Sequence, residues 1–286
     1  MLVDRLQAEP TGDGRVRRSL RMRFDDGEEH ACSVTVPEAF APPDADDASG
    51  PLPLALLLAM DRGEDLVVEG RACPRLLARV DRIRELYRAY EPALHPAAVR
   101  VAGALAAPAG EGARRTLCCF SRGVDSLYAA ADGRSRDGRI DALLYADRFE
   151  PVHGAATRAA ELALAERAAE LLALPLVVVD ADIRAPVDGR RDWEDAVGAG
   201  LAWLGHALAG GAERLVVPPS DTIWRLGPSG SNPVLDAHFA TAALELEHAD
   251  LVPSRVDKVA FLARERPELL ALLKVCFTED RTDNCG

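Results

Sequence analysis

The chain has 286 residues and a formal net charge of −12, from 34 basic and 46 acidic side chains. This acidity argues against nucleic acid as a partner, because contacts to phosphate backbones need clustered positive charge. Only two of the basic residues are lysines, Lys258 and Lys274, and neither follows a glycine, so the sequence excludes a Walker A loop. The length allows either one large domain or two smaller ones.

The sequence shows no sign of a membrane or secreted protein. The longest apolar run, residues 54–60 (LALLLAM), is far too short to span a bilayer. The first ten residues, MLVDRLQAEP, lack the basic region and apolar core of a secretion signal. The six cysteines are irregularly spaced and indicate reduced thiols rather than a disulfide framework. We therefore expect a cytoplasmic protein with no membrane partner.

Residues 1–108 predict a small α+β domain. Within it, residues 16–37 alternate apolar and polar side chains on both sides of the turn signal Asp25–Glu28, which predicts a β-hairpin. Four further segments follow in chain order: a loop at 41–51, a strand at 65–69, a helix at 74–90 and a strand at 99–101. The Gly- and Ala-rich residues 102–113 are expected to link this domain to the next. We expect the domain to recognise the substrate or to form a homodimer, two roles between which the sequence does not choose.

Residues 114–286 change to an alternation of strands and helices. The predicted strands are 116–120, 140–145, 176–180 and 214–218, and the predicted helices are 125–131, 157–172 and 193–208. The strands are continuous apolar runs such as LCCF and LVVV, which is typical of strands buried on both faces of a parallel sheet. We therefore expect an α/β domain with its ligand site at the carboxyl ends of the strands.

Residues 120–128 (FSRGVDSLY) lie at such a carboxyl end, directly after the first predicted strand. A turn from a strand into a helix presents N–H groups at the positive end of the helix dipole, which favours an anion. Gly123 is expected to allow tight curvature and close approach of a ligand, and Ser121 and Ser126 to supply hydroxyl donors. Asp125 is expected either to hold Mg²⁺ or to cap the helix. The alternative is a capped turn that binds no ligand.

Residues 121–126 (SRGVDS) resemble the S-G-G-x-D-S signature of the N-type PP-loop ATP pyrophosphatases, a superfamily of adenine nucleotide α-hydrolases. It includes asparagine synthetase, GMP synthetase, 7-cyano-7-deazaguanine synthase and tRNA thiolation enzymes. The positions that match are Ser121, Gly123, Asp125 and Ser126. Arg122 stands where the family usually has its first glycine. We expect Arg122 to keep a negative φ, with its side chain either reaching the departing pyrophosphate or pointing to solvent. We also expect Arg122→Gly to keep nucleotide binding.

The resemblance covers about residues 114–286. Pro218–Asp221 (PPSD) is similar to a segment in which several members place a Ser-Asp pair near pyrophosphate and metal. Pro253–Lys258 (PSRVDK) resembles the late basic segment whose lysine or arginine reaches the departing phosphates. Cys276 and Cys285 look like the start of a C-terminal cysteine cluster that binds zinc in some relatives. Two cysteines do not complete a zinc site, so we expect zinc only if the chain continues beyond Cys285.

The resemblance implies that ATP, with Mg²⁺, adenylates a carboxylate or carbonyl oxygen and releases pyrophosphate. A nitrogen nucleophile then forms an amide, nitrile or related C–N bond on a small molecule or peptide. The implied residues are, for catalysis, Lys258, Arg255 and Ser126; for the nucleotide, Ser121, Arg122, Gly123, Val124, Asp125, Ser126 and Tyr145; for magnesium, Asp125 and Asp221; for the substrate, Ser220, Arg225, Ser231 and Asp236. Most of the substrate contacts come from the long Gly-, Pro- and Ser-rich loop 221–236. The alternatives are a surface lysine at 258 and a flexible surface loop at 221–236.

Two other functions stay open. The first is sulfur insertion, including tRNA thiolation, which would need a reactive cysteine. At least one of Cys118 and Cys119 is expected to face the core and to be inert. The second is a nucleotide-binding module without catalysis, which the unusual Arg122 keeps open. His206 and His248 are expected on helices, as surface or core residues rather than catalysts.

Overall fold

The computed structural model describes residues 1–105, 114–136, 138–150 and 154–275, and the chain divides into two compact units. Unit 1 comprises Met1–Arg114, Asp182–Glu213 and Gly227–Leu246, and unit 2 comprises Arg115–Ala181, Arg214–Leu226 and Glu247–Gly286. The first change of unit, after Arg114, adjoins the predicted linker. Two later segments that the sequence placed in the second domain group with unit 1 instead. Within the described residues, no helix has both the length and the apolar composition that crossing a membrane requires.

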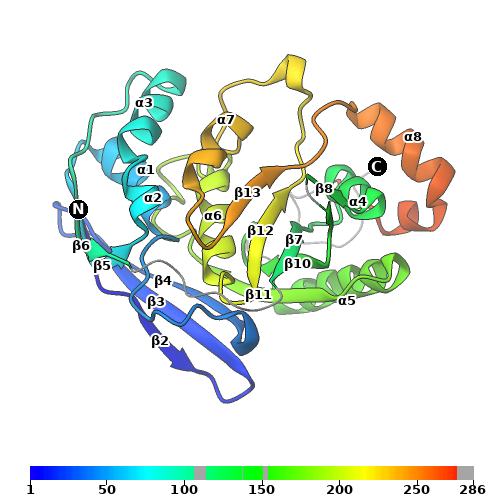
Figure 1. Cartoon of the computed structure of the whole chain (residues 1–286), viewed down its shortest axis with the longest axis horizontal. Helices are drawn as coiled ribbons and strands as arrows, with labels where there is room; N and C mark the ends of the chain where they lie inside the picture. The colour runs from blue at the N-terminus through cyan, green and yellow to red at the C-terminus, as the bar shows by residue number, and fades with distance from the viewer. Residues whose placement is uncertain (106–113, 137, 151–153, 276–286) are drawn as a thin grey trace. The chain divides into compact units, whose positions relative to one another are not determined.

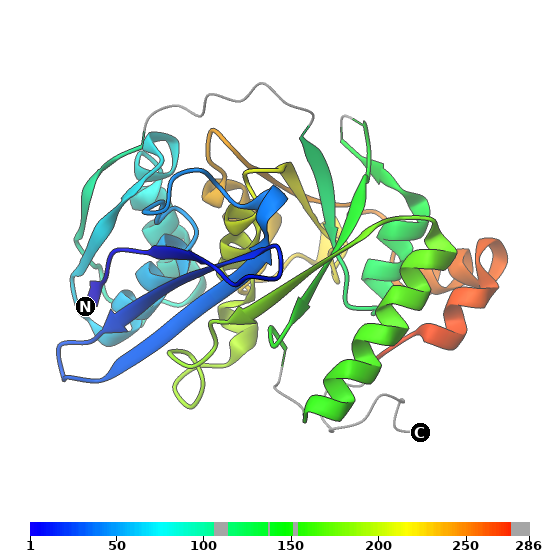
Figure 2. The same cartoon turned by 90° about the horizontal axis from the view of Figure 1, so that it is seen from below.

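The sheet of unit 1 is mixed and has the strand order β4-β3-β1-β5-β6, with β2 paired to β3. Its strands are β1 (Leu2–Val3), β2 (Gln7–Pro10), β3 (Arg15–Arg23), β4 (Glu29–Pro37), β5 (Leu66–Ala72) and β6 (Val99–Ala104). Strands β3 and β4 pair antiparallel, with Arg23 opposite Glu29, which confirms the predicted hairpin. Figure 2 shows this hairpin as a long two-stranded ribbon. Met22 and Val34 are fully buried, because alternate side chains of each strand face the core.

The helices of unit 1 include one that is almost completely buried. They are α1 (Leu52–Arg62), α2 (Pro74–Leu77), α3 (Val80–Tyr90), α6 (Val197–Ala207) and α7 (Pro233–Asp236), with the 3-10 helices η1 (Glu38–Phe40), η2 (Trp193–Asp195) and η4 (Ala237–Phe239). All residues of α1 from Leu52 to Met60 are buried, as in a core helix. The prediction of one helix from Pro74 to Tyr90 is wrong, because Arg79 has φ −106° and ψ −4° and separates α2 from α3.

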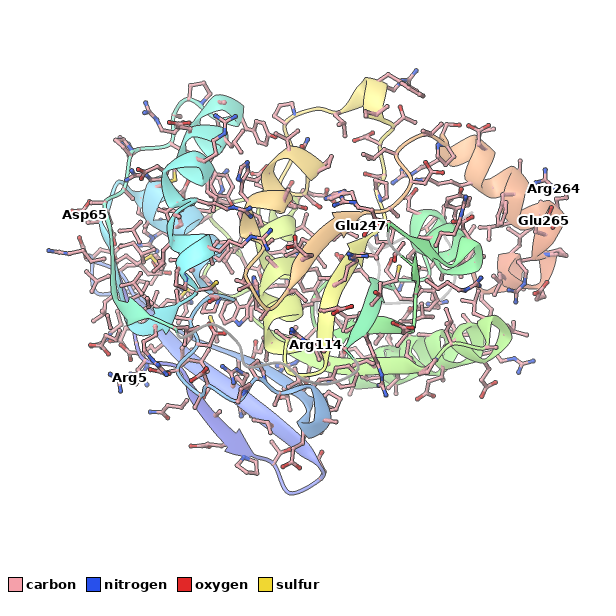
Figure 3. The ribbon with its side chains drawn as sticks, in the orientation of Figure 1. Arg5, Asp65, Arg114, Glu247, Arg264 and Glu265 are labelled. Carbon is pink, nitrogen blue, oxygen red and sulfur yellow. The ribbon has the colours of Figure 1, made fainter. Side chains whose placement is uncertain are left out.

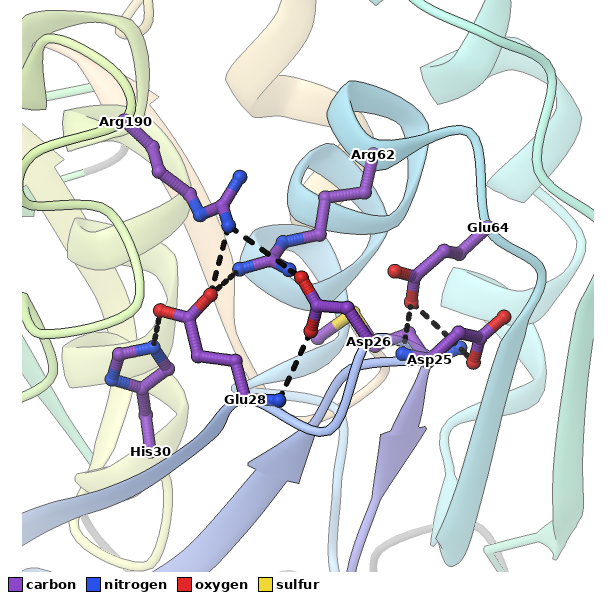
Figure 4. Close-up of polar contacts among 8 residues, drawn as sticks. Asp25, Asp26, Glu28, His30, Arg62, Glu64 and Arg190 are labelled. Carbon is purple, nitrogen blue, oxygen red and sulfur yellow. Dashed lines mark hydrogen bonds and ion pairs between the residues drawn. The ribbon is translucent and has the colours of Figure 1, made fainter.

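An ion-pair cluster joins the turn between β3 and β4 to other parts of unit 1 (Figure 4). The Glu28 carboxylate accepts hydrogen bonds from Arg62, at the end of α1, and from Arg190, whose Nη2 lies 2.8 Å from Glu28 Oε2. His30 Nε2 lies 2.7 Å from the other carboxylate oxygen. These contacts lower the pKa of Glu28 to about 2, chiefly through Arg62 and then through Arg190 and His30. The guanidinium of Arg62 also lies 3.6 Å from the ring centroid of Phe24.

The sheet of unit 2 has the strand order β11-β10-β7-β12-β13. Its strands are β7 (Arg115–Cys119), β10 (Ala142–Asp147), β11 (Leu176–Asp182), β12 (Ala212–Val217) and β13 (Glu245–His248), of which Asp182, Ala212–Glu213 and Glu245–Leu246 are counted with unit 1. Strands β7, β10 and β11 are parallel neighbours, with Leu143 opposite both Cys118 and Leu176, as the apolar runs predicted. His248 ends β13, so its prediction on a helix is wrong. This strand has four residues, too few for the sequence to show a period of two.

Helices pack against the strands of unit 2. They are α4 (Val124–Asp132), α5 (Ala155–Leu172) and α8 (Arg255–Glu265), with the 3-10 helices η3 (Ile223–Arg225) and η5 (Pro267–Leu272) and the short hairpin of β8 (Arg134–Ser135) and β9 (Gly138–Arg139). Figure 1 shows α4 and α8 side by side. They meet through the rings of Tyr128 and Phe261, whose centroids are 5.2 Å apart. Leu127 of α4 and Leu262 of α8 belong to the same buried cluster, so the core of unit 2 holds both helices in place.

Candidate functional site

The turn between β7 and α4 is held by hydrogen bonds among its own serines. Ser121 N–H donates to Ser126 Oγ at 3.3 Å, and Ser126 Oγ donates to Gly123 O at 3.1 Å. The N-cap of α4 is Gly123, and no side chain caps this end of the helix. The expectation that Asp125 caps it is therefore wrong, because Asp125 lies in the first turn. The N–H groups at this end keep their capacity for an anion.

Arg122 differs from each expectation made for it. Its φ is +63°, not negative, whereas Gly123 has φ −66° and ψ 163° and needs no glycine freedom. Its side chain neither reaches into the turn nor points to solvent, because it is 1% exposed and forms an ion pair with Glu161 of α5. Arg122 Nη1 also donates to Leu272 O at 2.9 Å. The physical reason is that a buried carboxylate on α5 requires a cation, and Arg122 supplies it.

Lys258 brings together three segments that are far apart in the sequence. Its Nζ lies 2.7 Å from Asp125 Oδ1 and 2.5 Å from Pro219 O. Lys258 is 1% exposed, so the alternative of a surface lysine is wrong. It lies in the first turn of α8, which begins at a capping box formed by Ser254 and Asp257. The turn after β7, the segment after β12 and the start of α8 therefore meet at one ammonium group.

Two cationic side chains of α8 contact the two carboxylate oxygens of Asp125. Lys258 contacts Oδ1, while Nε and Nη2 of Arg255 each lie 3.2 Å from Oδ2. The Arg255 side chain is 63% exposed, whereas that of Asp125 is 17% exposed. Asp125 thus orients two cations beside the uncapped N-terminus of α4. Such an arrangement suits an anion with several negative charges, because charged donors and a helix dipole act on the same place.

The predicted magnesium ligands are Asp125 and Asp221. Asp221 is exposed, in the turn that follows Ser220, which is exposed as well. Within the part of the chain that the structure describes, no group of three or more His, Cys, Asp and Glu side chains is arranged to hold a metal ion. Mg²⁺ in nucleotide sites commonly takes one or two carboxylates and completes its shell with phosphate oxygens and water. The role of the two aspartates stays a prediction.

Tyr145 lies in β10, opposite Val178 of β11, and is half-buried. Burial, and after it the negative charges of Glu161 and Asp147, raise the pKa of its phenol to about 12. The phenol is therefore neutral at physiological pH and can act as a hydrogen-bond donor. The buried pair of Arg122 and Glu161 lies near enough to influence it, so Tyr145 and the turn after β7 belong to the same region of unit 2.

The four predicted substrate residues divide between the units. Ser220 and Arg225 belong to unit 2 and are exposed, Arg225 at the end of η3. Ser231 and Asp236 belong to unit 1, where Ser231 Oγ donates to Asp236 Oδ2 at 2.9 Å. Asp236 is completely buried. The loop 221–236 contains η3 and α7 and so is more structured than the sequence suggested.

The cysteines of unit 2 differ in exposure. Cys118 is fully buried, and burial raises the pKa of its thiol well above the ordinary value. Cys119 is partly exposed. This confirms that at least one of the pair faces the core. The expectation for Cys276 and Cys285 concerns residues outside the described part of the chain.

Sequence reasoning missed Glu161 and gave Lys274 no role in the site. Lys274 Nζ lies 2.6 Å from Glu161 Oε1, and both side chains are buried. A signal for Glu161 was available, because it shares a helical face with the buried Ala165 and Ala168 at spacings of four and seven residues. A charged residue on the apolar face of a helix requires a buried partner. The sequence does not show which residue that partner is.

Comparisons with protein-family models, with curated proteins and with solved structures found no match for this chain. Beyond the sequence, only the geometry of unit 2 therefore indicates a function. Its distinctive feature is the convergence of Ser121, Asp125 and Lys258, with the main chain at Pro219, around the N-terminus of α4.

Proposed function

We propose that unit 2 binds ATP with Mg²⁺ and acts as an ATP pyrophosphatase, which adenylates a carboxylate or carbonyl oxygen of its substrate and releases pyrophosphate. A nitrogen nucleophile then attacks the adenylated carbon and displaces AMP, whose bond to that carbon breaks, to form an amide, nitrile or related C–N bond on a small molecule or peptide. One observation carries the proposal. The Lys258 ammonium contacts both Asp125 and Pro219 O, so the three segments that resemble the PP-loop signature and its supporting motifs converge.

The residues present fit a bound triphosphate. The N-terminus of α4 has no capping side chain, so its N–H groups can donate to phosphate oxygens. The hydroxyls of Ser121 and Ser126 adjoin it and can donate as well, once Ser121 gives up its contact of 3.5 Å with Ser126 Oγ and Ser126 gives up its hydrogen bond to Gly123 O. Lys258 and Arg255 supply positive charge on the same side, from the first turn of α8.

In the proposed reaction these residues bind the phosphate groups of ATP and stabilise their negative charge. ATP supplies the electrophilic α-phosphorus, and Mg²⁺ neutralises part of the phosphate charge. The main-chain N–H groups and Ser126 orient the phosphates, and Lys258 stabilises the negative charge that develops on the departing pyrophosphate. Asp125 keeps the Lys258 ammonium pointed toward the turn. Positioned cations of this kind act mainly in the transition state, where the leaving group gains charge.

The test follows the fate of ATP labelled at the α-phosphorus. We expect the protein, Mg²⁺ and a fractionated metabolite extract to produce AMP and pyrophosphate in equal amounts. If the substrate is a carboxylate, added hydroxylamine should intercept the adenylate and give a hydroxamate. Formation of ADP and phosphate instead, or no binding of ATP by the purified protein, would contradict the proposal. Binding without any AMP formation across all fractions would favour a nucleotide-binding module.

The proposal leaves the other expectations as they were. A small-molecule or peptide substrate, a cytoplasmic location and a homodimer stay predictions. Sulfur insertion is the competing reaction at the same site, and it requires a reactive thiol. The complete burial of Cys118 makes this residue a poor nucleophile, because the thiolate is the reactive form and burial disfavours it. This observation argues against Cys118 as the reactive thiol, whereas Cys119 is partly exposed.

A further inference from the structure

The main chain of Arg122 is in a conformation that favours glycine. Its φ of +63° is left-handed, where the Cβ of an L-residue crowds the carbonyl oxygen. A glycine at this position would adopt that conformation without steric cost. An arginine there raises the free energy of the turn, so contacts of its side chain must offset the cost if the turn is to persist.

Those contacts are buried and involve two other parts of unit 2. The Arg122 guanidinium forms an ion pair with Glu161 of α5 and donates from Nη1 to Leu272 O, at the end of η5. The side chains of the ion pair are 2% and 9% exposed. A buried ion pair that loses one partner leaves an uncompensated charge. Moving the side chain of Arg122 out of this position would therefore raise the free energy of the folded protein.

The main-chain carbonyl of Arg122 is fixed as well. Lys274 N–H donates to Arg122 O at 3.0 Å, while Lys274 Nζ lies 2.6 Å from Glu161 Oε1. In a planar trans peptide the C=O and the following N–H point in opposite directions. Fixing Arg122 O toward residue 274 therefore fixes the direction of the Gly123 N–H on the other side. That N–H lies 3.4 Å from Ser121 Oγ, inside the turn.

We infer that Arg122 is a positioning residue, which holds the turn between β7 and α4 in its anion-binding conformation before a nucleotide arrives. It does so through Glu161 and the segment Leu272–Lys274, so the phosphate affinity of the turn depends on α5 and on the end of η5. The expected effect on nucleotide affinity rests on the proposed ATP binding, whereas the ordering of the turn by Arg122 does not. A preorganised turn binds more tightly, because the ligand does not have to order it.

Arg122 does not itself act as a phosphate ligand. Its side chain is buried, Nη1 and Nη2 are engaged with Leu272 O and Glu161, and Nε is buried with no hydrogen-bond partner among the described residues. Its contribution to ATP binding is therefore indirect, and variants should act through the order of the turn. This reverses the expectation that Arg122→Gly keeps nucleotide binding, since both premises of that expectation are wrong.

The experiment compares the full-length wild type with Arg122→Gly, Arg122→Ala and Arg122→Lys. Amide hydrogen exchange of residues 120–126 is measured without nucleotide, and the Kd for MgATP is measured at a temperature where each variant is folded. Arg122→Gly removes the side-chain anchor but relieves the main chain, so we expect faster exchange and roughly tenfold weaker ATP binding. Arg122→Ala keeps the strain as well and should be affected more. Arg122→Lys keeps the charge without the forked donor and should restore part of the affinity.

The matched control is Arg191→Gly in unit 1. The side chain of Arg191 is also largely buried, at 7% exposed, and is paired with Asp61, Glu91 and Asp195. We expect it to lower the melting temperature without changing exchange in residues 120–126 or the Kd for ATP. Unchanged exchange in Arg122→Gly, or an equal effect of Arg191→Gly on ATP binding, would overturn the inference. If wild type binds no ATP, the proposed function fails, while the exchange data still decide whether Arg122 orders the turn. If Arg122→Ala does not fold, Arg122→Gly and Arg122→Lys still compare the loss of the side-chain anchor with its partial restoration.

Discussion

Lys258 Nζ lies 2.7 Å from Asp125 Oδ1, although 133 residues separate the two in the chain. This contact joins the start of α8 to the first turn of α4, and the same ammonium group reaches Pro219 O after β12. The aspartate of the SRGVDS turn therefore orients a cation rather than standing free. Phosphate oxygens that enter the turn would meet an ammonium group already placed beside the helix N-terminus.

The first prediction concerns Lys258→Met. The variant leaves the mostly buried carboxylate of Asp125 without its closest cation, so we expect it to lower the free energy of unfolding by about 3 kcal/mol. AMP formation per folded molecule should fall by about 10²-fold or more, because a positioned cation acts on the charge of the leaving group. Urea denaturation measures the stability, and release of pyrophosphate measures the activity.

The control for Lys258→Met is Arg264→Met, at the other end of the same helix. Figure 3 labels Arg264 and its neighbour Glu265 on α8. Their side chains are 69% and 49% exposed, and an exposed ion pair of this kind contributes little. We expect Arg264→Met to change neither quantity measurably. A Lys258→Met protein that is less stable yet fully active would show that Lys258 has a structural role only.

The second prediction concerns Glu161→Gln. Glutamine has nearly the same shape as glutamate but no charge, so the buried cations Arg122 and Lys274 lose their common anion. We expect a loss of about 3 kcal/mol in the free energy of unfolding. Adding Arg122→Gly to Glu161→Gln should cost less than the sum of the two single changes, because both remove the same ion pair. Additive losses in urea denaturation would show that the two residues do not depend on each other.

Much of the fold was predictable because the relevant signals are local. The hairpin of β3 and β4 follows from its alternating side chains and its Asp-Asp-Gly turn, and the strands β7, β10 and β11 follow from their apolar runs. Short strands were missed, among them Leu2–Val3 and Glu245–His248, because two to four residues cannot show a period. The grouping of Asp182–Glu213 with unit 1 was missed as well, since it depends on contacts with residues far away in the sequence.

The sequence named several residues of the candidate site, but it did not show how their side chains are arranged. The resemblance of the SRGVDS turn named Ser121 and Asp125, and that of the PSRVDK segment named Lys258, but no local pattern gives the direction of a side chain. For Arg122 that direction depends on Glu161, which lies 39 residues further on, and on a carbonyl 150 residues further on. A positive φ at Arg122 follows from those contacts, so it could not be read from the six residues of the turn.

The third prediction separates nitrogen from sulfur chemistry. Each of the six cysteines is changed to alanine, and the formation of AMP and pyrophosphate is measured along with the coupled product. We expect all six variants to keep full turnover, because attack by a nitrogen nucleophile needs no protein thiol. Burial raises the pKa of the Cys118 thiol and raises that of Cys32 to about 12, which disfavours the reactive thiolate at these two positions. Thiol labelling of the folded protein at about pH 8 should therefore be slow at both positions. Loss of product with any single variant would support a protein thiol in the mechanism and contradict nitrogen chemistry.

The last prediction concerns the pH dependence of stability in unit 1. The pKa of Glu28 is lowered from 4.5 to about 2, chiefly by Arg62 and then by Arg190 and His30. A carboxyl group with a lowered pKa stabilises the folded state above its ordinary pKa, and this contribution is lost as the pH falls through the folded value. The contribution of Glu28 is thus complete above pH 4.5 and declines between pH 4.5 and about 2.

We therefore expect Glu28→Gln to lower the melting temperature at neutral pH, and the difference from wild type to shrink as the pH falls from 4.5 to about 2. Thermal unfolding across this range measures the difference. The control is Glu29→Gln, since Glu29 makes an exposed ion pair with Arg21, and such a pair contributes little at any pH. A difference between wild type and Glu28→Gln that stays constant over the range would show that the charge of Glu28 does not stabilise the turn.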